Sequence, residues 1–571
     1  MTSSLSPCSE WPRAWPTLPI HTSAWIGEEG GLRRWDPLLE ACQQMARARG
    51  VPQILSVSRP FPGLDPLVVL AHTLHSLRVN EPVRPEDPGY CYLSHRARSG
   101  AVRVLGLGSL RRVYLLGEGR FQAARAFLEE LQPHLHAEEA SWGCLSQPIR
   151  QERPLCFSRF SFNPVRTCGP AAMLVLPQWQ LLQAQAGGPD SRQDKLGQDK
   201  LGWQGLLGRQ GSPTVARLNL EVCPESDLAS LASQIADFFA QMERFSQETL
   251  PPWELQAPLQ VDVDGQVLLA RIQKALQAIR AGSLEKVVLA EAVDLPLPSP
   301  PPIPSLLAYL EKRYPDCSVF AFAEGVGSRE SLSSGDGQDD LVRACPPGSS
   351  GSAYSNLSQR VFLGASPERL LSVWQGQVQI DALAGSAARG ETDSQDQALA
   401  QQLLHSTKDR REHQLVVRSV REALGQVGLD PFIPPRPRLL RLANIQHLQT
   451  LIEADMPSNL HLFDLLEQLH PTAAVGGYPK QAAVRWLETV EPFDRSGYAA
   501  PLGWVDLQGN GEFVVAIRSA LIRGDRARLY AGAGIVADSH PEQEVAEIRL
   551  KLQSLAQALA MRSIPAVPTA P

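Results

Sequence analysis

The stretch EKVVLAEAVDL, residues 285–295, places a lysine at the start of an apolar strand. The apolar run at 287–290 and the alternation after it predict a short buried strand, with Lys286 at its beginning and Glu291 inside it. A lysine at such a position can extend its ammonium group into water. It can also lose water, which lowers its pKa and allows it to act as a base near neutral pH. Both interpretations are open from this stretch alone.

Candidate acids occur in two further segments. Glu368 follows a predicted strand in FLGASPERLL (362–371), where it is either a catalytic acid at a strand end or part of a solvent-facing turn. In STKDRREHQLVV (406–417), Asp409, Glu412 and His413 are spaced i, i+3, i+4 and would share one face of a helix. The alternative for this face is a solvated surface on which Lys408 pairs with Glu412.

A second group of charged residues lies near the end of the chain. In PEQEVAEIRLKL (541–552), Glu544, Glu547 and Lys551 fall on one helical stripe, which surface salt bridges alone would explain. Carboxylates from two helices can also converge on a hard cation. Mg²⁺ in proteins takes one or two carboxylates and completes its octahedron with water and substrate oxygens.

Two features could bind an anion. In YAGAGIV (530–536), Gly532 and Gly534 flank Ala533, and such backbone can approach a ligand closely and direct N–H groups at it. A tight packing turn is the alternative. Arg518 lies in the apolar segment FVVAIRSALI, which predicts a cation within a buried strand that could bind a carboxylate in a bidentate manner.

The elements that must position these residues become regular after about residue 260. Strands and helices mix without strict βαβ alternation, so we expect an α+β (mixed α/β) sandwich of β-sheets with flanking helices rather than a barrel or a doubly wound sheet. We expect helices at 265–282, 397–425 and 541–560, strands at 286–295, 318–323 and 360–385, and a hairpin at 511–536.

The chain has 571 residues, of which 43% are hydrophobic, and a net charge of −6, so its composition argues against nucleic acid and anionic lipid as partners. Nine irregularly spaced cysteines without a CxxC pair, and no signal peptide or membrane-spanning run, predict a cytoplasmic protein. We expect residues 1–250 to form a variable N-terminal part of the same fold, with a loop insertion near 187–205. Residues 260–562 would form the catalytic domain, with a flexible insertion near 325–358.

Taken in order, these segments closely resemble the chorismate-binding family, and within it the isochorismate synthases of the menaquinone/phylloquinone type. The resemblance covers about residues 265–555 and implies a large two-layered sandwich of β-sheets. It rests on the motifs KVVLA (286–290), FLGASPERLL (362–371), ALAGSAARG (382–390), KDRREHQLVV (408–417), NIQHL (444–448), LHPTAAVGGYPK (469–480), EPFDRSGYAAPLGWVD (491–506), VVAIRSALI (514–522), LYAGAGIV (529–536) and EVAEIRLKL (544–552).

The resemblance implies a role for each matching position. Lys286 would activate water for attack at C2 of chorismate, and Glu368 would protonate the departing C4 hydroxyl. Glu412 and Glu547 would bind Mg²⁺ as the cofactor, with Glu544 holding a metal-bound water. The small-molecule substrate chorismate is the expected partner, and the chain would be a monomer or a homodimer. The positions that match substrate-binding residues are Arg518, Tyr498, Gly532, Ala533, Gly534, Lys551, Gly385, Ser386 and His447.

Departures from sibling enzymes favour a reaction that stops at isochorismate. Ala384 stands where aminodeoxychorismate synthases commonly carry a nucleophilic lysine, and Ala474 where salicylate synthases usually carry threonine. Anthranilate synthases typically lack a lysine at position 286. A salicylate synthase remains the alternative, and a non-catalytic chorismate-binding protein is the third reading. Glu291 replaces an expected arginine; its separation of five from Lys286 puts the two on opposite faces of the strand, so we expect Glu291 to have a partner of its own.

Overall fold

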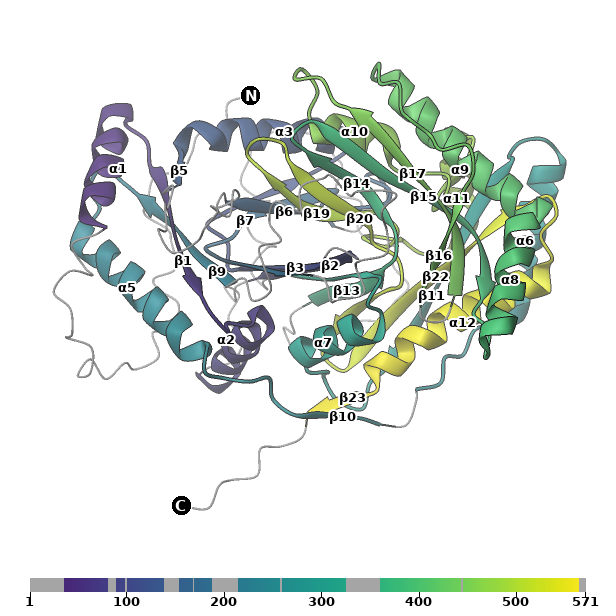
Figure 1. Ribbon diagram of the computed structural model, residues 1–571, viewed down its shortest axis with the longest axis horizontal. Helices are drawn as coiled ribbons and strands as arrows, with labels where there is room; N and C mark the ends of the chain where they lie inside the picture. Colours follow the sequence, from purple (N-terminus) through teal and green to yellow (C-terminus); the bar gives the residue numbers. More distant parts are fainter. Residues whose placement is uncertain are drawn as a thin grey trace, which may run out of the picture.

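Two large β-sheets with flanking helices make up the fold, in a computed structural model of the chain (Figure 1). The mixed α/β sandwich expected from the sequence is therefore confirmed. The two predicted insertions, near 187–205 and 325–358, lie outside the described residues. The structure describes residues 35–80, 89–97, 100–137, 154–167, 169–186, 214–256, 259–324, 360–442 and 445–563.

The larger sheet contains twelve described strands, and all neighbouring pairs are antiparallel except the last, at its N-terminal edge. Its order is β18 (Gly477–Tyr478), β11 (Lys286–Pro296), β22 (Arg526–Val536), β21 (Ser519–Arg523), β13 (Arg360–Ser366), β12 (Ser318–Glu324), β2 (Tyr90–Ala97), β3 (Gly100–Leu107), β8 (Trp179–Ala186), β9 (Thr214–Val222), β1 (Gln53–Phe61) and β5 (Leu135–Ala137).

The smaller sheet contains nine described strands, all antiparallel to their neighbours. Its order is β16 (Arg438–Arg441), β17 (Ile445–Asp455), β15 (Gln377–Ala388), β14 (Arg369–Trp374), β20 (Gly511–Val515), β19 (Pro501–Asp506), β6 (Leu155–Phe160), β7 (Ala172–Leu176) and β4 (Arg111–Leu115).

Both sheets take strands from the two halves of the chain, because β2 pairs with β12 in the larger sheet and β6 pairs with β19 in the smaller one. The predicted boundary near residue 250 stays a prediction.

Helices cover the outside, with α6, α8, α9 and α12 gathered around the end of the sheets where β11, β15 and β22 lie (Figure 1). The helices are α1 (Asp36–Arg49), α2 (Pro66–Asn80), α3 (Arg120–Leu131), α5 (Leu228–Phe245), α6 (Gly265–Arg280), α7 (Ile303–Arg313), α8 (Asp393–His405), α9 (Thr407–Gln426), α10 (Leu462–Leu469), α11 (Lys480–Val490) and α12 (Pro541–Leu559); η2 (Gln132–His134) is a 3₁₀ turn, and β10 (Trp253–Leu255) pairs with β23 (Met561–Ser563).

The chain passes from one sheet to the other at two adjacent places, and both correct the sequence prediction. The segment 511–536 is three strands rather than one hairpin, since β20 belongs to the smaller sheet and the hairpin β21–β22 to the larger. The segment 360–385 likewise contains β13 in the larger sheet and β14 and the start of β15 in the smaller. The two passages are hydrogen-bonded to each other, with the Val515 N–H donating to the Glu368 carbonyl at 3.0 Å and the Ser366 hydroxyl donating to the Val515 carbonyl at 2.6 Å.

The single helix predicted at 397–425 is two helices, α8 and α9, separated at Ser406. Ser406 has extended backbone (φ −62°, ψ 117°), and its hydroxyl accepts a hydrogen bond from the Asp409 N–H at 3.2 Å. A serine that caps a helix in this way competes with helix continuation, which explains the break. It also fixes where α9 starts, and therefore which way Glu412 points.

Two simpler expectations concern cysteines and membrane helices. The cysteines that the structure describes (Cys42, Cys91, Cys156, Cys223 and Cys317) are all free thiols. Among the described residues, no helix has both the length and the apolar character needed to span a bilayer.

Candidate active site

Lys286 is buried at the start of β11, with a side-chain exposure of 1%. Its backbone pairs with Tyr478 on one side and Val536 on the other, so the strand position is held from both edges. The ammonium nitrogen lies 3.0 Å from Oε1 of Glu412 on α9. A lysine with this burial does not keep its charge in water, so the structure excludes the solvent-extended interpretation of Lys286.

Glu368 occupies the passage between β13 and β14 and is buried. Burial raises its pKa to about 8, because a carboxylate loses the hydration that stabilises its charge. The positive charge of Lys286 lowers the pKa and the negative charge of Asp381 raises it, and neither outweighs burial. Glu368 is therefore mostly protonated at neutral pH and can donate a proton, while Lys286 is close enough to influence that proton.

Glu412, Glu544 and Glu547 come from α9 and α12, and each is paired with a different lysine. Glu412 pairs with Lys286 at 3.0 Å, Glu544 with Lys408 at 3.1 Å, and Glu547 with Lys551 at 2.7 Å. The predicted alternative pairing of Lys408 with Glu412 is not formed, since Lys408 reaches across to α12 instead. The three carboxylates are thus neutralised in this arrangement, although they stand on neighbouring helices.

The charges of these carboxylates influence one another. Burial raises the pKa of Glu544, and the negative charge of Glu547 adds to that increase against the opposing effect of Lys408. Burial is the largest influence on Glu547 and opposes its ionisation, but the charge and hydrogen bond of Lys551, with smaller effects of His447 and Lys408, together outweigh it, so the pKa of Glu547 lies below its ordinary value. This mutual influence places the two acids within one electrostatic environment.

The donor chemistry of this group fits Mg²⁺. The three side chains supply only carboxylate oxygens, which suit a hard cation, and Mg²⁺ needs only one or two of them when substrate and water complete its shell. Among the described residues, no three acidic, histidine or cysteine side chains are already gathered around one point. The space beside Glu412 depends on Gly534, because a Cβ there would lie 2.5 Å from Oε1 of Glu412 and 3.1 Å from Cε of Lys286.

Arg518 lies in the passage between β20 and β21, not within a strand as predicted. Its φ of +50° is unfavourable for a side-chain-bearing residue and turns the chain from one sheet into the other, a conformation that the alternating sequence pattern does not reveal. The guanidinium lies 3.5 Å from Nε2 of His447 on β17. Burial, together with the nearby charge of Arg518, lowers the pKa of His447 to about 3, so the imidazole is neutral.

The remaining predicted substrate positions lie on β15, on β22, on α12 and in the loop before β19. Lys551 donates to the Gly532 carbonyl at 2.9 Å, and a Cβ on Gly532 would lie 3.0 Å from the hydroxyl of Tyr498, which is buried and stacked on Tyr530. Gly532 and Gly534 pair with Ala290 and Val288, on the same face of the sheet as Lys286. By the same alternation, the side chain of Ala533 points to the opposite face, so only its backbone could serve this site.

Gly385 and Ser386 connect β15 to the first turn of α9. Gly385 has a φ of +73°, and a Cβ there would lie 2.9 Å from Cβ of Asp409. The Ser386 N–H donates to the carboxylate of Asp409, and Ser386 pairs in register with His447. These residues therefore hold the helix that carries Glu412 close to the strand that carries His447.

Glu291 faces away from Lys286, as its odd spacing predicted, and it has its own partner. Its carboxylate is ion-paired with Arg271 of α6 on the other side of β11, and its Oε1 accepts the Ala292 N–H at 3.0 Å. The replacement of an expected arginine is therefore accommodated by a buried pair that does not reach Lys286.

The sequence analysis assigned no role to Glu491 and Arg495, although both lie in one of the quoted motifs. Glu491 accepts the Ala290 N–H at 2.8 Å, and Arg495 donates to the Val288 carbonyl at 2.6 Å, so the pair completes the hydrogen bonding of β11 beyond β18. The two side chains are ion-paired at 2.6 Å and buried, and Arg495 also lies over the ring of Phe162 at 4.3 Å. Breaking such a buried pair typically costs about 3–5 kcal/mol. In the sequence, the i, i+4 spacing of Glu491 and Arg495 was the signal from which this ion pair could have been predicted.

The family described as chorismate binding enzyme matches residues 204–328 and 348–560, which is more than half of the chain. This chain belongs to the chorismate-binding enzyme family. All of the candidate residues above fall within the matched ranges, so the family assignment and the geometry concern the same part of the protein.

Curated relatives of this chorismate-binding enzyme include three bacterial proteins. The salicylate biosynthesis isochorismate synthase of Pseudomonas aeruginosa is 41% identical over 290 residues, covering 51% of this chain and 54% of that protein. The isochorismate synthase MenF of Bacillus subtilis is 44% identical over 200 residues, covering 35% and 42%. The isochorismate synthase MenF of Escherichia coli is 34% identical over 375 residues, covering 65% and 77%. The chain thus spans about half the length of the first two relatives.

Solved structures agree with the fold of this chorismate-binding enzyme. The menaquinone-specific isochorismate synthase MenF of Escherichia coli superposes with a TM-score of 0.63 at 27% identity, covering 91% of this chain and 99% of that structure. Anthranilate synthase component I of Streptococcus pneumoniae superposes with a TM-score of 0.54 at 16% identity, covering 80% and 92%, and this likeness concerns the fold alone.

Proposed function

We propose that this chain is a Mg²⁺-dependent isochorismate synthase, an isomerase that converts chorismate into isochorismate by water attack at C2 and loss of the C4 hydroxyl. The observation that carries the proposal is that a buried lysine, Lys286, and a buried carboxylic acid, Glu368, lie close enough for the charge of Lys286 to act on Glu368, whose pKa is nevertheless raised by burial to about 8. A base and an acid of these kinds are what the two proton transfers require. Relatives named for menaquinone and for salicylate biosynthesis match this chain at 34–44% identity, so the proposal concerns the reaction and not the pathway that uses its product.

The two side chains divide the chemistry between them. Lys286 accepts a proton from the attacking water, and Glu368 gives a proton to the C4 hydroxyl so that it leaves as water rather than as hydroxide. The Glu412 carboxylate lies 3.0 Å from the Lys286 nitrogen, so it holds the end of this side chain in place for the proton transfer. The burial of both groups excludes bulk water and orients the proton transfers.

The remaining residues hold a dianionic substrate. Glu412 and Glu547 would bind Mg²⁺, with Glu544 beside them, and the metal would neutralise a carboxylate of the substrate. Arg518 presents a guanidinium that no described carboxylate neutralises, in a passage between the sheets that is hydrogen-bonded to the passage holding Glu368. The backbone of Gly532 and Gly534 would allow the substrate to approach β22 closely.

Product analysis tests this function directly. Chorismate incubated with the purified chain and Mg²⁺ is expected to yield isochorismate alone, and removal of Mg²⁺ with EDTA is expected to abolish turnover until Mg²⁺ is restored. Chromatography of the reaction mixture identifies the product. Release of salicylate and pyruvate would instead identify a salicylate synthase, and tight chorismate binding without turnover would identify a non-catalytic binding protein.

Replacement of Gly534 with alanine is expected to lower kcat by about tenfold or more while the fold is retained. The new methyl group would displace the carboxylate of Glu412 and crowd Lys286, and both contacts are with ends of flexible side chains that can move without unfolding the protein. Gly425→Ala in α9 is the matched control, because its Cβ meets nothing within 4 Å. Steady-state kinetics and thermal unfolding of both variants provide the measurement, and an unchanged kcat in Gly534→Ala would contradict this account of the site.

A further inference from the structure

A groove of about 250 Å³ runs along the outer side of α9, beneath the loop that leads into β16. Helix α9 supplies one wall with a stripe of side chains, and the loop residues Pro434, Pro435 and Pro437 supply the other. None of the residues assigned to the proposed reaction lines this groove. It is therefore separate from the candidate active site, although both use the same helix.

The helix wall is strongly basic. Arg410, Arg418 and Arg421 line the groove, with Gln414 and Val417 between them, and this spacing places all five on one side of α9. The groove has no acidic residue among its described lining. The whole chain, in contrast, has 60 acidic and 54 basic residues and a net charge of −6, so a local cluster of three arginines departs from its average surface.

Two of these arginines are available to a ligand. Arg418 is engaged with Glu422 at 2.9 Å and lies over the ring of Tyr478 at 5.0 Å. Among the described residues, neither Arg410 nor Arg421 has an ion-pair or hydrogen-bond partner for its side chain. Guanidinium groups bind phosphate and carboxylate oxygens in a bidentate manner, so these two groups are complementary to anionic groups.

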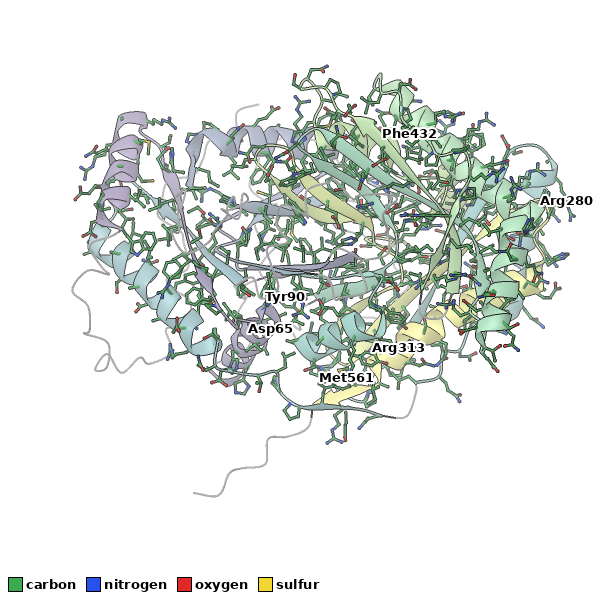
Figure 2. All side chains as sticks on the ribbon, viewed as in Figure 1. Asp65, Tyr90, Arg280, Arg313, Phe432 and Met561 are labelled. Carbon is green, nitrogen blue, oxygen red and sulfur yellow. The ribbon has the colours of Figure 1, made fainter. Side chains whose placement is uncertain are left out.

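The opposite wall and the floor are preorganised. Proline fixes its own φ and offers no N–H, so the three prolines form a stiff apolar wall. The loop is anchored at Phe432, which exchanges two backbone hydrogen bonds with Glu453 at 2.8 and 3.1 Å and has an exposed side chain (labelled in Figure 2). The floor is the buried pair of His413 and Thr450, joined at 2.7 Å.

The size of the groove limits the ligand. Its volume lies just below the range of roughly 300–1,000 Å³ that is usual for drug-sized ligands, so the occupant is a small metabolite rather than a folded partner. Arg410 and Arg421 are eleven residues apart, or about 16 Å along the helix axis at a rise of 1.5 Å per residue. A single phosphate cannot contact both guanidinium groups at this separation, whereas a molecule with an anionic group at each end can.

We propose that this groove is a binding site for a small metabolite that carries two separated anionic groups, such as a bisphosphate, held by Arg410 and Arg421 against the proline wall. The floor residue His413 follows Glu412 directly in α9, so a ligand here contacts the helix that supplies one of the candidate metal ligands. The site is independent of the function proposed above, and its test needs no turnover.

Fructose 1,6-bisphosphate is the probe, and fructose 6-phosphate is its matched single anion. Isothermal titration of the full chain is expected to give saturable binding of one bisphosphate per chain, at least tenfold tighter than binding of the monophosphate. The double variant Arg410→Gln/Arg421→Gln is expected to weaken bisphosphate binding by at least tenfold. The control double variant Arg244→Gln/Arg280→Gln removes the same charge from exposed positions on α5 and α6, with Arg280 at the far edge of the molecule in Figure 2, and is expected to bind normally.

Several outcomes would overturn the proposal. Equal losses in the two double variants would indicate diffuse attraction to positive charge, and binding that survives Arg410→Gln/Arg421→Gln would place the ligand in the candidate active site. Equal affinity for the two sugar phosphates would exclude a site that spans both arginines. Tighter binding of an octaglutamate peptide than of the bisphosphate would identify the groove as a docking surface for an acidic protein segment.

Discussion

Replacement of Lys286 with methionine or arginine is expected to lower kcat for chorismate turnover by about 10²- to 10⁴-fold, the usual contribution of a positioned base. Methionine fills the buried space without accepting a proton. Arginine keeps a positive charge opposite Glu412, but its pKa is too high for it to act as a base near neutral pH. Steady-state kinetics with saturating Mg²⁺, together with thermal unfolding, measure both effects.

The two variants of Lys286 separate the role of the base from the role of the charge. Lys286→Met leaves Glu412 without its partner and is expected to unfold at a lower temperature, whereas Lys286→Arg preserves the ion pair and the stability. Lys274→Met, at an exposed position on α6, is the control and should behave like the parent protein. If Lys286→Arg retained kcat within tenfold, the positive charge rather than proton transfer would explain the importance of this position.

Local patterns allowed much of the fold around Lys286 to be predicted. The strand at 286–295 and the helix at 541–560 were predicted within one or two residues, because an unbroken apolar run and a strict helical stripe determine those elements locally. Because side chains alternate between the two faces of a β-strand, the sequence also predicted that Glu291 and Lys286 lie on opposite faces. The partner of Glu291, Arg271, lies on another element and could not be predicted.

Features that depend on contacts between distant segments could not be predicted. The segment around Arg518 alternates like a continuous strand, and only the competing pairing partners of β20 and β21 show that the chain changes sheets there. The break at Ser406 did have a local signal, since the serine is followed three residues later by Asp409 in the spacing of a helix cap. Helical periodicity alone does not reveal it.

The electrostatic properties of the candidate site also required the structure. The sequence indicated which carboxylates could lie near each other, but it could not indicate that Glu544 pairs with Lys408 while Glu412 pairs with Lys286. Nor could it indicate that Glu491 and Arg495 complete the edge of β11, because that interaction joins segments about 200 residues apart. Burial is a property of the folded chain, so the raised pKa of Glu368 became visible only with the fold.

Replacement of Glu368 with glutamine is expected to lower kcat by about 10²- to 10⁴-fold and to change the pH dependence of the residual activity. The proposed mechanism requires Glu368 to be protonated, and its pKa of about 8 predicts that kcat of the parent chain falls tenfold per pH unit above pH 8. Glutamine has the same size and cannot ionise, so the residual activity of Glu368→Gln should lack this alkaline decline. Kinetics between pH 6 and pH 10 measure the difference, and Glu285→Gln, at an exposed position next to Lys286, is the control.

The same ionisation makes the free energy of unfolding depend on pH. A salt-bridged acid loses its contribution to stability as the pH falls, whereas Glu368 loses its contribution as the pH rises. Its pKa rises from an ordinary value of 4.5 to about 8 on folding, so between these pH values the folded chain binds a proton that the unfolded chain has lost. The stabilisation is complete below pH 4.5 and is lost as the pH rises through about 8. Glu368→Gln should therefore unfold with a weaker pH dependence than the parent over this interval. An unchanged pH dependence of both unfolding and kcat would exclude Glu368 as the buried acid of this site.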